Sequence, residues 1–211
     1  MRRAALIALA ASLGASACTQ PAGDLPEDSV ERAATCQAVR ALELSAGKAQ
    51  AGPVSFEGFT EILHFAMLAA AEDGVQVDLN RLFTVSQRAP AVMAELDGDE
   101  WPALVEPCNT AFAETQRPAE PLPPDLYEAG LTCFGLTEFL ARTATDYPAE
   151  RREMAQIADR ALQAAQPTLR ERASDNVEAQ RLAGGYAARG FKAGRPASLL
   201  GQCRRRFPPI P

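Results

Sequence analysis

Apolar side chains return every three or four positions through most of the chain, which is the spacing of one face of an α-helix. Before residue 112 this pattern predicts helices over 29–45, 55–73 and 78–96, and a fourth that begins at Trp101 with a proline in its first turn. A short alternation at Val75, Val77 and Leu79 is too brief for a strand without a partner, so we expect an extended link there.

The second part of the chain repeats this plan. Four helices are predicted, over 125–146, 148–166, 168–182 and 196–206, and the glycine-rich stretch 184–194 reads as a hinge before the last of them. The chain is rich in Ala and Leu and poor in the β-branched residues that favour strands. These features predict an all-α fold.

The cysteines indicate an internal duplication. Cys36 and Cys108 are separated by almost the same number of residues as Cys133 and Cys203, and apolar neighbours of the matched cysteines agree at helical offsets. Four cysteines permit three pairings, and the repeat favours Cys36 with Cys108 and Cys133 with Cys203. We therefore expect two tandem disulfide-closed helical bundles of about four helices each, over 29–117 and 125–207, joined by a Pro-rich linker at 118–124 and followed by a tail at 208–211.

The N-terminus predicts export. Residues 1–17 combine two early arginines, a short apolar stretch and a small-residue end, as a secretory signal peptide does. The run from Leu13 to Cys18 resembles a lipobox, although Ala15 stands where a larger aliphatic residue is common. Lipidation of Cys18 would also explain why the chain has five cysteines, an odd number for an oxidising compartment. Ordinary cleavage after Ala17 is the alternative.

These features predict a lipoprotein on the periplasmic side of the outer membrane, with 18–28 as its tether, or else a soluble periplasmic protein. The lipid would hold the protein at the membrane. The net charge is −6, so binding to nucleic acid is not expected.

Candidate chemistry is sparse. Glu61 and His64 have the i, i+3 spacing of a di-iron half-site, but such a site needs a second Glu-x-x-His, and the chain has one histidine. We therefore expect His64 at the edge of the core stripe of its helix, and we expect no metal and no cofactor. A nucleophile with a histidine base would have to use the same residue.

The acidic run before the only tryptophan is the candidate partner-binding segment: Asp97, Asp99, Glu100 and Trp101. Tryptophan beside charge is typical of an interface anchor. The alternative is that Trp101 covers the core where its helix begins, with the acids stabilising the helix N-terminus.

These observations favour a non-catalytic envelope lipoprotein that binds an unknown envelope protein or serves as a structural accessory. One alternative is a periplasmic bundle that binds a small hydrophobic ligand in a cavity lined by Phe56, Phe59 and Met67. A second is a hydrolase that uses paired carboxylates, which would have to face each other across a cleft.

Overall fold

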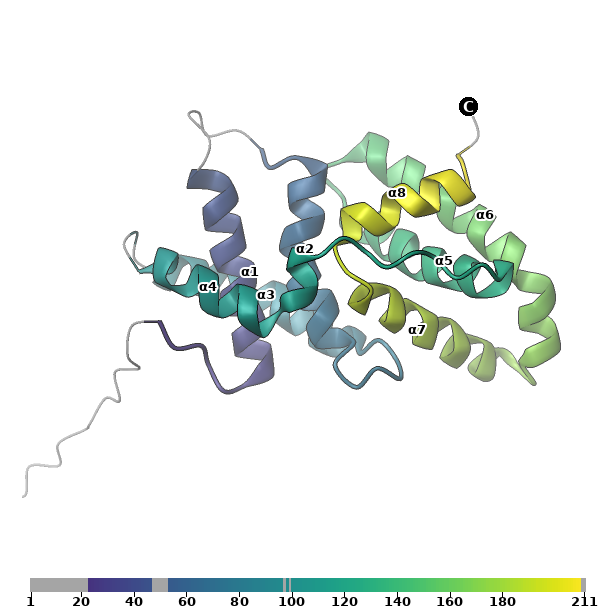
Figure 1. Ribbon diagram of the computed structural model, residues 1–211, viewed down its shortest axis with the longest axis horizontal. Helices are drawn as coiled ribbons and strands as arrows, with labels where there is room; N and C mark the ends of the chain where they lie inside the picture. The colour runs from purple at the N-terminus through teal and green to yellow at the C-terminus, as the bar shows by residue number, and fades with distance from the viewer. Residues whose placement is uncertain (1–22, 47–52, 97, 99, 210–211) are drawn as a thin grey trace, which may run out of the picture.

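The computed structural model describes residues 23–46, 53–96, 98 and 100–209, and this part of the chain is all-helical. It holds eight α-helices and one short 3-10 helix, and it contains no strand. The first four helices lie to one side and the last four to the other (Figure 1). None of these helices is long and apolar enough to cross a membrane.

The helices before the Pro-rich segment begin close to the predicted positions. They are α1 (Ser29–Ala46), α2 (Phe56–Ala70), α3 (Leu79–Glu95) and α4 (Trp101–Ala111), followed by η1 (Ala113–Gln116). The side chain of Ser55 caps α2 by accepting from the backbone N–H of Gly58, and Asp78 caps α3 in the same way. Of the alternating residues, Val75 lies in a bend and Val77 in a short irregular link, whereas Leu79 is already the first residue of α3.

The second set of helices differs from the prediction at two places. Its members are α5 (Leu126–Thr143), α6 (Pro148–Arg172), α7 (Asn176–Lys192) and α8 (Pro196–Arg206). The predicted break near Pro167 is wrong, because α6 continues to Arg172. Ala165 and Leu169 are buried around Tyr127 and Leu131, and this packing offsets the hydrogen bond that the proline removes.

The glycine-rich stretch is not a hinge over most of its length. Gly184, Gly185 and Gly190 lie inside α7, and only Gly194 lies in the turn before α8, with a φ of +132°. Close packing explains Gly190: a Cβ there would stand 3.1 Å from the side chain of Thr132. Helix α7 begins after its N-cap residue Asp175, whose carboxylate accepts from the backbone N–H of Glu178.

Two disulfides tie the first helix of each set to its last. Cys36 in α1 is bonded to Cys108 in α4, and Cys133 in α5 is bonded to Cys203 in α8. The cysteines of each bond are 72 and 70 residues apart, and all four side chains are buried. The predicted pairing is confirmed.

The two sets of helices share one core. The largest apolar cluster joins Leu63 and Met67 of α2 to buried residues of α5, α6, α7 and α8. Contacts of α2 with α7 and α8 accompany those that it makes with α1 and α3. Helix α2 therefore belongs to both sides of the molecule, as its central place in Figure 1 illustrates.

The Pro-rich segment between the two sets is hydrogen-bonded to the second set at several positions. The backbone N–H of Ala119 donates to the hydroxyl of Ser198, and that of Leu122 donates to the side chain of Gln202, both on α8. Arg117 and Glu120 also form backbone hydrogen bonds with the turn before α8. These bonds fix the segment against the second set of helices.

Candidate functional site

The predicted partner-binding segment is described in part. Asp97 and Asp99 lie outside the described residues, as does Cys18. Glu100 is exposed, and Trp101 is half-buried at the first turn of α4. The indole packs against the small apolar cluster that surrounds the Cys36–Cys108 disulfide. This contact agrees with the alternative in which Trp101 covers the core. The part of the residue that remains exposed agrees with the interface hypothesis.

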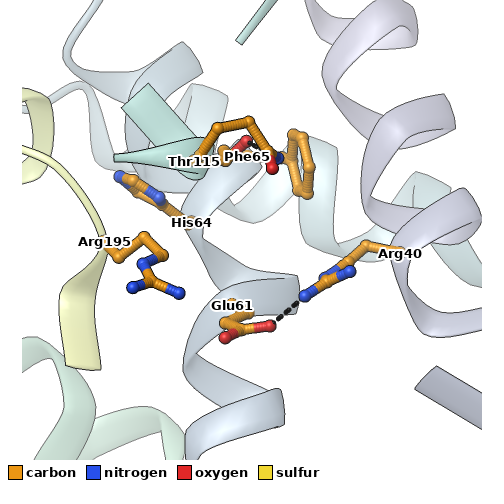
Figure 2. A pocket seen from close by; sticks show the side chains of 7 residues that line it. Arg40, Glu61, His64, Phe65, Thr115 and Arg195 are labelled. Atoms are coloured by element: carbon orange, nitrogen blue, oxygen red, sulfur yellow. Dashed lines mark hydrogen bonds and ion pairs between the residues drawn. The ribbon is translucent and has the colours of Figure 1, made fainter. Parts of the chain in front are cut away.

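A small crevice lies where α2 meets the second set of helices. Its wall includes Arg40 of α1, Glu61 and His64 of α2, Thr115 of η1 and Arg195 of the turn before α8 (Figure 2). Arg40 forms ion pairs with Glu61 and Glu43. The crevice has a volume of about 10 Å³, which is room for about one water molecule. It is too small to hold an organic substrate.

His64 is fully buried in the core, so the prediction that it lies at the edge of the core stripe is wrong. It is 1% exposed, and its Nε2 lies 2.8 Å from the carbonyl oxygen of Phe191 in α7. Burial lowers the pKa of His64 to about 4, although Glu61 and Glu114 act in the opposite direction. The ring is therefore neutral near pH 7, and Nε2–H donates to Phe191 while Nδ1 has no partner in the described residues.

The position of His64 explains why helical periodicity misplaced it. The stripe of α2 that faces α1 and α3 is only one of its buried faces, because α7 and α8 cover another. On a helix that packs on one side only, a position outside the apolar stripe is exposed to solvent. On a helix that packs on two sides, such a position is buried even when its residue is polar. His64 thus joins α2 to α7 through one hydrogen bond, and this role is structural.

Glu61 and His64 do not form a metal site with other side chains. Across the described residues there is no group of three or more His, Cys, Asp or Glu side chains placed to hold an ion. The carboxylate of Glu61 is bound by Arg40, and Nε2 of His64 is used by the backbone of Phe191. Both potential ligands are already engaged within the protein.

A second, larger cavity was not foreseen from the sequence. It is a cleft of about 240 Å³ between the turn after α2 and the helices α5, α6 and α7, and we name it the Tyr–Arg cleft after its main residues: Tyr127, Tyr186, Arg172, Arg181 and Arg189. Tyr127 comes from α5, Arg172 from the end of α6 and the other three from α7, so only the packing of three helices brings them together.

No family model, curated protein or solved structure matches this chain.

Proposed function

We propose that this protein is an exported lipoprotein, anchored through Cys18 on the periplasmic side of the outer membrane, that acts as a protein-binding or structural accessory and not as an enzyme. The main observation in favour of export is the pair of buried disulfides, one for each set of helices. Such bonds form and persist in oxidising compartments and are rare in the cytosol of most organisms. They account for four of the five cysteines and leave Cys18 as the odd one.

We further propose that the chain arose by duplication of one disulfide-closed bundle. Helix α1 packs against α2, α3 and α4, and α5 packs against α6, α7 and α8. The residue after the last helix of each set has nearly the same backbone geometry, with φ and ψ of −126° and 61° at Phe112 and −131° and 66° at Phe207. Each of these phenylalanines donates its backbone N–H to the carbonyl of the disulfide cysteine four residues earlier.

The form of the cavities supports an accessory role over catalysis. Glu61 is the one carboxylate among the residues that line the crevice, and none lines the Tyr–Arg cleft, so neither cavity brings two acids together. The hydrophobic-ligand alternative gains no support from Phe56 and Phe59. Their rings pack against Tyr147, and neither residue lines either of these two cavities.

Palmitate labelling in cells tests the anchor. The wild-type protein should take up label and sediment with outer membranes, whereas Cys18→Ser should do neither. Thr19→Ala is the matched control, because it changes the neighbouring residue and keeps the cysteine. Recovery of the unlabelled wild-type protein in the soluble periplasmic fraction would refute the anchor.

The protein-binding role is tested at Glu100 and Trp101. A photo-crosslinking residue placed at the exposed Glu100 should give one discrete crosslinked species in cells, and the same residue at exposed Arg170 on α6 is the control. Equal, diffuse crosslinking from both positions would contradict a partner site at this end of α4.

A further inference from the structure

The Tyr–Arg cleft is built around two aromatic rings that each carry a guanidinium group. The rings of Tyr127 in α5 and Tyr186 in α7 meet edge to face, with centroids 5.4 Å apart. The guanidinium of Arg172 lies over the ring of Tyr127 at 4.6 Å, and that of Arg189 lies over the ring of Tyr186 at 3.8 Å. Stacking of this kind holds an arginine in place without a carboxylate and leaves the N–H groups at its edge free to donate.

The charge of the cleft is not balanced by its own acids. The nearby carboxylates are Glu178, which pairs with Arg181, and Glu128, which accepts from the hydroxyl of Tyr186 at 3.0 Å. In the described part of the chain Arg172 and Arg189 form no ion pair. Three arginines around the cleft face two nearby carboxylates, so the cleft keeps a net positive charge, which favours the entry of an anion.

A buried hydroxyl in the wall of the cleft also lacks a partner. Tyr127 is 3% exposed, and its hydroxyl has no hydrogen-bond partner among the described residues. A buried polar atom without a partner is unfavourable, so its presence needs a reason. Burial raises the pKa of Tyr127, so the phenol stays protonated and can donate at neutral pH.

We propose that the Tyr–Arg cleft binds a phosphate group, carried by a small organic phosphate or by a lipid headgroup. A phosphate has oxygens directed to several sides, which suits donors that come from three helices, whereas a planar carboxylate meets one guanidinium edge at a time. Gly74 and Val75 of the turn after α2 complete the wall, and Val75 is 63% exposed there. The volume of about 240 Å³ accommodates the phosphate together with a few carbon atoms.

Binding is measured with the oxidised mature chain from residue 18 onward that carries Cys18→Ser, so that neither the signal peptide nor a lipid anchor contributes. The soluble probes are inorganic phosphate and glycerol 3-phosphate, followed by calorimetry, with acetate for comparison. The membrane probes are vesicles of phosphatidylglycerol, with phosphatidylcholine for comparison, followed by sedimentation. Saturable binding of glycerol 3-phosphate would identify a soluble phosphate as the ligand, and binding of phosphatidylglycerol vesicles alone would identify a headgroup.

Three variants test whether the cleft is responsible. Replacing both Arg172 and Arg189 by Gln should weaken binding by about tenfold or more, since both charge-assisted contacts to the phosphate are lost. Tyr127→Phe should weaken it about three- to tenfold with no loss of thermal stability, because the hydroxyl has no partner within the protein. Arg170→Gln, on the exposed face of the same helix α6 as Arg172, should leave binding unchanged.

The proposal is overturned by several results. These are the absence of saturable binding to every phosphate probe, acetate binding as tight as phosphate binding, or an equal loss of affinity in Arg170→Gln. Binding that Tyr127→Phe does not weaken would place the phosphate elsewhere on the protein.

Discussion

Acidification should destabilise the protein through His64 in a way that one substitution can isolate. The folded protein holds this ring neutral with a pKa of about 4, whereas a histidine in the unfolded chain has its ordinary pKa of about 6.5. As the pH falls, the unfolded chain therefore binds a proton first. The stability that the neutral ring contributes is complete above about pH 6.5 and is lost as the pH falls toward 4.

The expected magnitude follows from these two pKa values. Between about pH 7.5 and pH 5 the linkage relation gives a loss of about 2 kcal/mol in the free energy of unfolding from this group alone. His64→Gln supplies the comparison, because a glutamine amide can donate to the carbonyl of Phe191 and does not titrate. Carboxylates that titrate in the same range are present in both proteins, so the difference between them reports His64.

Urea unfolding of wild type and His64→Gln at both pH values measures the effect. Between these pH values the free energy of unfolding of the wild type should fall by about 2 kcal/mol more than that of the variant. Parallel shifts would refute the reasoning, since they would mean that His64 takes up protons equally in the folded and unfolded protein.

Three further outcomes follow from the packing. Gly135→Ala should destabilise the protein by about 2 kcal/mol or more, because its Cβ would lie 2.3 Å from that of Ala187. Gly184→Ala inside α7 should instead raise the melting temperature, because the new Cβ meets only the flexible side chain of Gln76. Equal melting temperatures of the two variants in calorimetry would contradict the close crossing of α5 and α7. Replacing Cys133 and Cys203 together by Ala should lower the free energy of unfolding by about 4 kcal/mol in urea titrations, and a loss below about 1 kcal/mol would show that the loop closure contributes little. Trp101→Ala should lower the melting temperature by several degrees, since the indole packs against the Cys36–Cys108 cluster; unchanged stability with loss of a crosslinked partner would instead favour the interface hypothesis.

Most helix starts other than that of α7 were predictable because their signals are local. Ser55, Asp78 and Asp125 cap their helices with their own side chains, and Pro148 and Pro196 stand at first helical positions. The disulfide pairing was predictable for a related reason, since equal spacings and matched neighbours are visible in the sequence. These features need no knowledge of the tertiary structure.

The features that escaped prediction all depend on contacts between distant segments. Pro167 and Gly190 are unfavourable inside a helix by themselves, but packing around Tyr127 and against Thr132 keeps α6 and α7 continuous. His64 is buried because α7 covers a second face of α2. The Tyr–Arg cleft exists only after three helices have come together, so no short motif marks it.

The connectivity of the disulfides simplifies oxidative folding of the chain. Each of the four helical cysteines is bonded to its neighbour in the sequence, Cys36 to Cys108 and Cys133 to Cys203. A chain that emerges from its N-terminus presents the first pair before Cys133 appears. Once that bond has closed, Cys133 and Cys203 are the only two of the four helical cysteines that remain unpaired. Oxidation in order of emergence therefore yields the native bonds directly, and thiol–disulfide reshuffling has no wrong pairing among these four to correct.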